Sequence, residues 1–250
     1  MNKKLKVFIT GASSGIGAAM AQLFVQAGAQ VAITGRRKDR LDEAATKLAQ
    51  LGPGSAYAYE LDIIDSVATQ RVLEQFTEKV GGLDVLINNA GIGFWGPAMQ
   101  ANLTDWNAML DVNLRGLMTI TRLALPYLVQ SASGPRGVAD IVSISSIAGR
   151  KVPGAVGSVY AATKHALGAF SEGLRQELAP QHVRVGLVEP GIVSTEMTTG
   201  GAPYAPDARA PKGLGVLQAL DVARAVQYIV GQPQHVAVNE VLIRPTEQVV

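Results

Sequence analysis

A glycine-rich turn close to the N-terminus constrains the fold of this chain more than any other stretch. Residues 10–17 read Thr-Gly-Ala-Ser-Ser-Gly-Ile-Gly, after a short apolar run and before the helix-forming residues 18–24. A strand, a glycine turn and a helix in this order form the first half of a βαβ unit. Gly11 permits the tight turn, Gly15 permits close approach of a ligand, and Gly17 lets helix and strand pack closely. The helix N-terminus then offers free N–H groups to a diphosphate.

Length and composition exclude several classes of protein. At 250 residues we expect one large α/β domain spanning residues 1–250, with no interdomain linker. The net charge of +2 comes without a basic block, so we expect no nucleic-acid partner. The absence of cysteine excludes disulfides, thiolate metal sites and cysteine nucleophiles, and it fits a cytoplasmic protein. No stretch reaches the roughly 20 apolar residues that span a bilayer, so we expect no membrane segment. The three histidines show no metal-ligand spacing, and no metal is expected.

The end of the second expected strand, residues 30–34, indicates which dinucleotide would bind. An NAD-binding unit usually places Asp or Glu about 20 residues after the glycine loop, where it holds the ribose 2′-hydroxyl. This chain has no carboxylate there and instead has Arg36 and Arg37. Guanidinium groups match the geometry of a phosphate, so we predict a 2′-phosphate and hence NADP(H). The alternative is that both arginines belong to a solvated loop.

Hydrophobic patterning predicts the remaining elements. We expect further strands at 57–61, 83–87, 139–144, 183–188 and 239–244, and helices at 41–51, from 66, from 104, at 160–178 and at 220–230. Ser145 and Ser146 follow the strand at 139–144, at the sheet edge where α/β enzymes place their ligands. Phe94 and Trp95 lie in a loop, and they line either a substrate cleft or the core.

Tyr160 and Lys164 form the pair with the most definite chemistry. They are four residues apart in an expected helix and therefore share one helical face. A free tyrosine has a pKa of about 10 and is a poor base at neutral pH. A nearby ammonium favours the phenolate and lowers that pKa, so the tyrosine can exchange a proton with an alcohol or carbonyl oxygen.

Several of these features occur in an order that resembles the short-chain dehydrogenase/reductase family. They are the glycine turn at 10–17, Asn-Asn-Ala-Gly at 88–91, the strand-ending Ser146, and Tyr-x-x-x-Lys at 160–164. The resemblance covers residues 6–245. It implies a single Rossmann-fold domain, in which a doubly wound, seven-stranded parallel sheet carries helices on both faces. It also implies a homo-oligomer, either a dimer or a tetramer.

The resemblance also implies roles for individual residues. The catalytic residues are expected to be Asn113, Ser146, Tyr160 and Lys164. The cofactor-binding residues are expected to be Gly11, Ser13, Ser14, Gly15, Ile16, Gly17, Arg36, Arg37, Asp62, Asn89, Ala90, Gly91, Tyr160, Lys164, Pro190, Gly191, Val193 and Thr195. Ser14 stands where many NADP-dependent relatives carry a basic residue. Ser145 is expected to pack or to bond to backbone.

Two of these residues keep an alternative interpretation. In the family, the residue matching Asn113 holds a water near the active site through its backbone, whereas a purely structural side chain would bridge helix turns. The residue matching Asp62 accepts a hydrogen bond from the adenine amino group. Asp62 could instead cap the helix that begins near Ser66.

Together the features predict an NADP(H)-dependent oxidoreductase. It would transfer hydride between the nicotinamide and a small aldehyde, ketone or secondary alcohol. The tail at 245–248 resembles a subgroup of clavulanate-type aldehyde reductases and serine or 3-hydroxy acid dehydrogenases, and the irregular stretch 196–215 would form a substrate lid. One alternative is a 3-oxoacyl-[acyl-carrier-protein] reductase, which the low net charge disfavours. The other is a non-catalytic dinucleotide sensor.

Overall fold

Seven parallel strands form one sheet in the computed structural model, which describes residues 4–152, 154–199 and 213–249. The strands are β1 Lys6–Ile9, β2 Gln30–Gly35, β3 Ser55–Glu60, β4 Val85–Asn88, β5 Ala139–Ile144, β6 Val183–Pro190 and β7 Glu240–Ile243. Their order across the sheet is β3-β2-β1-β4-β5-β6-β7, and every neighbouring pair is parallel. The predicted doubly wound, seven-stranded parallel sheet is therefore confirmed.

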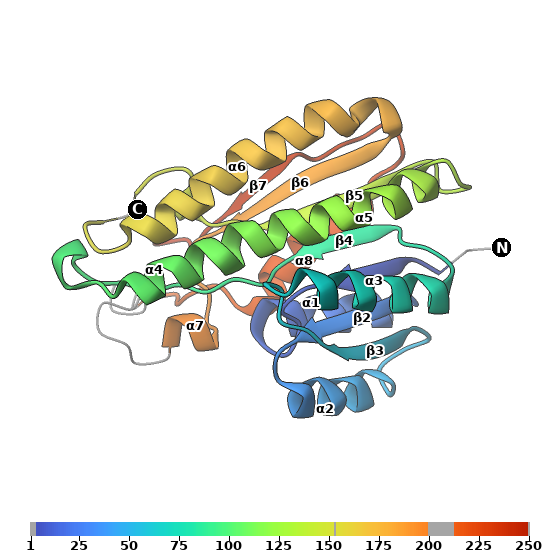
Figure 1. The fold of residues 1–250 in the computed structure, drawn as a ribbon, viewed down its shortest axis with the longest axis horizontal. Helices are drawn as coiled ribbons and strands as arrows, with labels where there is room; N and C mark the ends of the chain where they lie inside the picture. Colours follow the sequence, from blue (N-terminus) through green and yellow to red (C-terminus); the bar gives the residue numbers. More distant parts are fainter. Residues whose placement is uncertain (1–3, 153, 200–212, 250) are drawn as a thin grey trace.

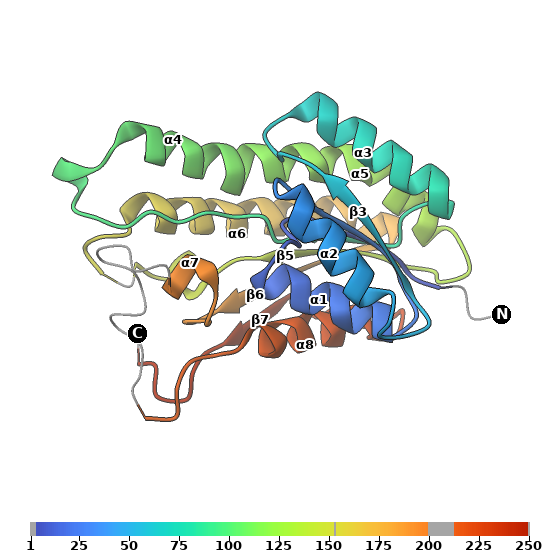
Figure 2. The same ribbon diagram turned by 90° about the horizontal axis from the view of Figure 1, so that it is seen from below.

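Helices cover both faces of this sheet (Figure 1). They are α1 Gly15–Gln26, α2 Lys38–Leu48, α3 Ser66–Val80, α4 Leu103–Leu110, α5 Leu117–Ala132, α6 Ser158–Leu178, α7 Glu196–Thr199 and α8 Ala219–Val230. Figure 2 shows α1, α2 and α8 on one side of the sheet and α3, α5 and α6 on the other. Right-handed crossovers place helices on both faces in this way when all strands are parallel.

The central strands are apolar on both faces, as a doubly covered sheet requires. In β1 the side chains alternate between the two layers, so that Val7 and Ile9 pack towards α1 while Phe8 packs towards α3. Phe8 meets Phe76 of α3 edge to face, with ring centroids 5.8 Å apart. Full burial of these aromatic and aliphatic side chains stabilises each helix layer against the sheet.

The long helical segment from 103 to 132 is not one regular helix. Between α4 and α5, residues Asp111–Gly116 form a π-helical segment. Gly116 lies so close to the loop after β3 that an added Cβ would be 2.8 Å from the Ile63 carbonyl oxygen. The sequence predicted a helix from 104 onward without this irregularity. Segments of this type are often found at functional sites.

The sheet order changes direction between β1 and β4. The chain moves outward from β1 to β3 and then returns to lay β4 on the other side of β1. In open α/β sheets a crevice at the carboxyl ends of the strands opens at such a switch point. The two conspicuous motifs of the sequence, at 10–17 and 88–91, directly follow these two strands. Most of the predicted lid at 196–215 lies outside the described residues.

Candidate active site

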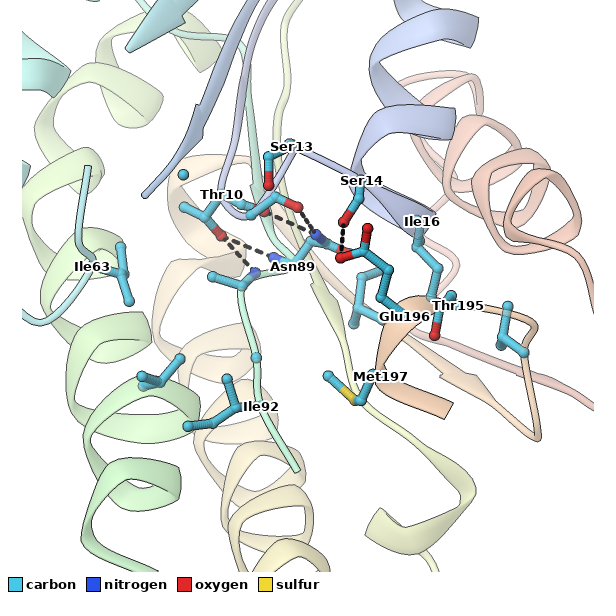
Figure 3. A pocket seen from close by; sticks show the side chains of 18 of the residues that line it. Thr10, Ser13, Ser14, Ile16, Ile63, Asn89, Ile92, Thr195, Glu196 and Met197 are labelled. Atoms are coloured by element: carbon cyan, nitrogen blue, oxygen red, sulfur yellow. Dashed lines mark hydrogen bonds between the residues drawn. The ribbon is translucent and has the colours of Figure 1, made fainter. Parts of the chain in front are cut away.

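The glycine turn after β1 and the Asn-Asn-Ala-Gly turn after β4 are bonded to each other. Asn89 Nδ2 donates to the carbonyl oxygens of Thr10 and Gly11, at 2.9 and 2.8 Å. In return, Thr10 Oγ1 accepts hydrogen bonds from the backbone N–H groups of Asn89 and Ala90, both at 3.0 Å (Figure 3). The two turns therefore form one cradle.

Glycine is required at two points of this cradle. Gly11 has φ +67°, and an added Cβ would lie 2.8 Å from Ala90 Cα. A Cβ on Gly17 would lie 2.3 Å from the Gly11 carbonyl oxygen. Helix α1 begins at Gly15 with Ser14 as its N-cap residue, and no side chain caps its first N–H groups. Its N-terminus can therefore offer donors and a partial positive charge to an anion.

A cavity of about 420 Å³ opens at this edge of the sheet. Its walls include every predicted site residue except Gly17 and Asn113, namely Gly11, Ser13, Ser14, Gly15, Ile16, Arg36, Arg37, Asp62, Asn89, Ala90, Gly91, Ser146, Tyr160, Lys164, Pro190, Gly191, Val193 and Thr195. Gly17 lies beneath the turn, and Asn113 lies behind the loop after β4. The structure thus brings together residues from the carboxyl ends of six strands, β1 to β6, around a cavity within the volume range typical of ligand sites.

The two arginines after β2 line the cavity but differ in their contacts. Arg37 Nη2 donates to Ser13 Oγ at 2.9 Å and to Ser14 Oγ at 2.8 Å, so its guanidinium lies over the glycine turn. Arg36 is exposed. The sequence did not predict the role of Glu196 of α7, which pairs with Arg37 and also with Arg40.

Tyr160, Lys164 and Ser146 lie together on the other side of the cavity. Tyr160 and Lys164 are one turn apart on α6, and Lys164 Nζ lies 5.7 Å from the centroid of the tyrosine ring. Lys164 is only 7% exposed, and its ammonium donates to the Ile144 carbonyl oxygen at 2.9 Å. Ser146 follows β5, and its Oγ accepts from the Ala148 N–H at 3.1 Å. That contact leaves the serine proton available to another acceptor.

Burial dominates the titration behaviour of these groups. Desolvation raises the pKa of Tyr160 above its ordinary 10.0, while a hydrogen bond with Ser146 lowers it. Desolvation lowers the pKa of Lys164 from 10.5 to about 8. The expected depression of the Tyr160 pKa by Lys164 is not seen in this structure, in which desolvation is the largest effect on the phenol and the Lys164 ammonium donates to the Ile144 carbonyl oxygen.

The side chain of Ser145 differs from that of Ser146 in making no hydrogen bond to a described residue. It is 4% exposed, and its Oγ has no hydrogen-bond partner among the described residues. Ser145 therefore packs, as one of the two expected arrangements, and its backbone N–H donates to the Val188 carbonyl oxygen at 2.7 Å. An unpaired buried hydroxyl is destabilising.

The structure excludes one interpretation of Asn113 and one of Asp62. The Asn113 side chain accepts from Ile92 N–H and donates to the Ile92 carbonyl oxygen, both at 2.9 Å, and donates to Thr163 Oγ1 at 3.2 Å. It therefore joins the π-helical segment to the loop after β4 and to α6, instead of bridging helix turns. The N-cap of α3 is Asp65, whose carboxylate accepts from Ala68 N–H, so the alternative interpretation of Asp62 as the helix cap is wrong.

Phe94 and Trp95 have different surroundings. Phe94 is 43% exposed and is not a core residue. Trp95 is half-buried, and its ring packs on Tyr160. The aromatic loop therefore meets the candidate site through Trp95.

Within residues 4–152, 154–199 and 213–249, no group of three or more His, Cys, Asp or Glu side chains is arranged to hold a metal ion. No helix in the described part of the chain is both long and apolar enough to cross a membrane.

The comparisons with known proteins agree with this geometry. The model of the short chain dehydrogenase family matches residues 5–203. Serine 3-dehydrogenase from Agrobacterium fabrum is 39% identical over 97% of this chain and 94% of its own length. Sulfoacetaldehyde reductase 2 from Chromohalobacter salexigens is 39% identical with the same coverage. The solved closed form of a serine dehydrogenase complexed with NADP+ is 34% identical, covers 98% of this chain and 97% of its own, and superposes with a TM-score of 0.88.

This protein belongs to the short chain dehydrogenase family of oxidoreductases. The resemblance stated from the sequence is thereby confirmed.

Proposed function

We propose that this protein is an NADP(H)-dependent oxidoreductase that interconverts a small aldehyde or ketone and the corresponding alcohol. The observation that carries the proposal is that Ser146, Tyr160 and Lys164 share one cavity with the glycine turn and with Arg37. A hydride-transfer site needs a dinucleotide cradle next to a proton donor, and the residues of this cavity are suited to both roles.

The residues present fit a dinucleotide with a 2′-phosphate. The uncapped N-terminus of α1 and the positive-φ glycines Gly11 and Gly15 suit a diphosphate. Arg37, fixed on Ser13 and Ser14, stands where the ribose of such a cofactor is expected. NADP+ bound to a serine dehydrogenase of the same fold supports this assignment.

The proposed chemistry divides between the cofactor and three side chains. When bound, the dinucleotide supplies or accepts the hydride. The Ser146 hydroxyl, which already accepts from a backbone N–H, donates a hydrogen bond to the substrate oxygen and polarises it. The Tyr160 phenol gives its proton to that oxygen during reduction and takes it back during oxidation. Lys164 places a buried ammonium one turn below the phenol.

Asn113 is proposed to act behind these groups. Its side chain fixes the loop after β4 through two hydrogen bonds to Ile92. Its backbone lies in the π-helical segment, where regular i→i−4 bonding is interrupted. We place a proton-relaying water at this backbone, supplied from solvent.

The substrate class is proposed from the relatives and the site together. Curated relatives that match nearly the whole chain are named for serine and for sulfoacetaldehyde, which are small polar molecules. We therefore expect a small aldehyde or β-hydroxy compound here, with a cytoplasmic homodimer or homotetramer as the active form.

Cofactor titration followed by turnover tests this function. Fluorescence titration should show tighter binding of NADPH than of NADH. Consumption of NADPH should then follow addition of a panel of small aldehydes, with serine and secondary alcohols tested in the reverse direction. Binding without turnover on any of these would favour a dinucleotide sensor. Turnover only with an acyl-carrier-protein thioester would favour a 3-oxoacyl reductase.

A further inference from the structure

A carboxylate from a distant part of the chain lies on the arginines at the end of β2. Glu196 Oε2 is 2.8 Å from Arg37 Nη1, and Glu196 Oε1 pairs with Arg40 Nη1. Ser14 Oγ lies 3.4 Å from the same Oε2 atom. Figure 3 shows Glu196 directed from its short helix towards Ser14 in the glycine turn. The two oxygens of one carboxylate therefore engage two guanidinium groups.

The two arginines form a site that suits an anion with more negative charge than a single carboxylate. Arg37 precedes α2 and Arg40 follows three residues later, so the two guanidinium groups lie on one side of that helix. Hydroxyls of Ser13 and Ser14 hold the Arg37 guanidinium in place. The hydrogen bonds from Arg37 and Arg40 lower the pKa of Glu196, which keeps its carboxylate ionised. Two cations thus face a single negative charge.

We infer that Glu196 weakens the preference for NADP(H) by occupying the 2′-phosphate site, so that NADP(H) binds only by displacing its carboxylate from Arg37 and Arg40. This inference rests on the proposed function. A phosphate monoester carries about −1.5 to −2 charges near pH 7 and three acceptor oxygens, so it replaces one carboxylate on two arginines favourably. NAD(H) has a hydroxyl at this position and leaves Glu196 in place. Glu196 therefore lowers the affinity for NADP(H) and leaves the affinity for NAD(H) unchanged.

The expected change in NADPH affinity is modest, because the ion pairs of Glu196 with Arg37 and Arg40 are solvent-accessible. The side chains of Arg37, Arg40 and Glu196 are 39%, 45% and 55% exposed. Exposed ion pairs contribute little free energy and are screened by salt. We expect removal of the Glu196 charge to tighten NADPH binding about fivefold, which corresponds to about 1 kcal/mol.

The test is a fluorescence titration of the full chain with NADPH and with NADH at low and high salt. Glu196→Gln should bind NADPH about fivefold more tightly than the wild type and should bind NADH within twofold of it. Arg40→Gln should weaken NADPH binding and leave NADH binding unchanged. The change in NADPH affinity of each variant should become smaller as the salt concentration rises.

Glu43→Gln is the matched control. Glu43 lies on α2, pairs with Lys47, and is within electrostatic reach of Arg40. The control removes the same charge near the same arginine without opening the anion site, so NADPH binding should stay within twofold of the wild type.

The outcomes separate this inference from the proposed function. Wild-type preference for NADPH, combined with unchanged or weaker NADPH binding by Glu196→Gln, would overturn the inference alone. An equal gain in NADPH affinity in Glu196→Gln and Glu43→Gln would also overturn the inference alone, because the gain would then reflect only the change in net charge. If the wild type bound neither dinucleotide, the proposed function would fail and this inference with it.

Discussion

The indole ring of Trp95 packs on the ring of Tyr160, with centroids 5.6 Å apart and ring planes tilted by 49°. Gly93 makes room for the indole, since a Cβ there would lie 2.5 Å from the ring. Backbone bonding between Gly96 and Val156 ties the two loops together. Trp95 thus forms a wall beside the proposed proton donor and contributes to its desolvation.

Replacement of Trp95 by alanine should impair turnover while sparing the cofactor. Aromatic pairs of this geometry are worth about 0.5–1.5 kcal/mol, so we expect kcat/KM to fall about three- to tenfold. Because less burial surrounds Tyr160, its pKa should also fall, and the pH–rate profile should shift accordingly. Phe94→Ala is the control, since Phe94 is largely exposed. Equal effects of the two variants would rule out a specific role for Trp95.

Tyr160→Phe should remove the proton transfer and keep the binding site. General acid–base catalysis contributes about 10²–10⁴-fold, so kcat should fall by at least about a hundredfold. NADPH affinity should remain within about threefold, because the ring and its packing on Trp95 are preserved. Steady-state kinetics and fluorescence titration measure the two quantities. Near-normal turnover in this variant would refute the proposed mechanism.

Lys164 should make folding stability rise with alkaline pH. Below about pH 8 its amine is protonated in both states, and the folded protein carries the full cost of the buried ammonium. Between about 8 and 10.5 the folded protein binds fewer protons than the unfolded chain, so this residue's contribution to the free energy of unfolding increases. The increase should be at most about 3 kcal/mol. Urea unfolding at pH 7.5 and 10 checks this, and Lys164→Met should lack that increment. An identical pH dependence in both proteins would contradict the assignment.

The two adjacent serines should differ in what their replacement by alanine changes: activity at Ser146 and, if anything, stability at Ser145. Ser146→Ala removes the hydroxyl proposed to polarise the substrate, and we expect kcat to fall about 10²-fold. Ser145→Ala removes a buried hydroxyl without a described partner, so the protein should be unchanged or more stable by up to about 1–2 kcal/mol. Kinetics and thermal unfolding of both variants provide the comparison. A large loss of activity in Ser145→Ala would show that the catalytic serine was misassigned.

Gly17→Ala should damage the cofactor cradle. Its Cβ would lie 2.3 Å from the Gly11 carbonyl oxygen and 2.7 Å from Asn89 Nδ2, so the backbone must move. Overpacking of this kind costs about 1–3 kcal/mol, and we expect dinucleotide affinity to fall at least tenfold. Gly173→Ala in α6 is the control, because an added Cβ there meets nothing within 4 Å. It should raise stability by about 0.5–1 kcal/mol. Calorimetry measures the stability of both variants, and cofactor titration measures their dinucleotide affinity. Wild-type stability and affinity in Gly17→Ala would contradict the prediction.

The sheet and the cavity lining could be predicted because their signals are local. Each buried strand is a short apolar run, and the motifs directly follow β1, β4 and β5, whose carboxyl ends share one edge. β5 matches its predicted range of 139–144, whereas β4 begins at Val85, two residues later than predicted. Strand ends depend on pairing with neighbours, which a run of apolar residues does not specify.

Other features depend on contacts that the sequence pattern does not encode. Glu196 reaches Arg37 across 159 positions, and nothing in either segment marks the pair. Asp65 and not Asp62 caps α3, because the helix begins at Ser66, directly after Asp65. The Lys164 ammonium donates to the Ile144 carbonyl oxygen, a bond that the four-residue spacing of Tyr160 and Lys164 does not predict. Thr10 stands in the glycine turn, yet its bonds to the second turn arise only when β4 pairs with β1.

The reciprocal bonds between Thr10 and Asn89 have a consequence for synthesis of the protein. A growing chain that ends after β3 already contains the whole glycine turn, α1 and both arginines. It still lacks Asn89, which lies 79 positions after Thr10 and supplies the other half of the cradle. The nascent chain therefore gains its dinucleotide site only when β4 leaves the ribosome and inserts beside β1. At that moment the cradle itself is complete, while the cavity walls that come from β5, α6 and β6 are still to be added.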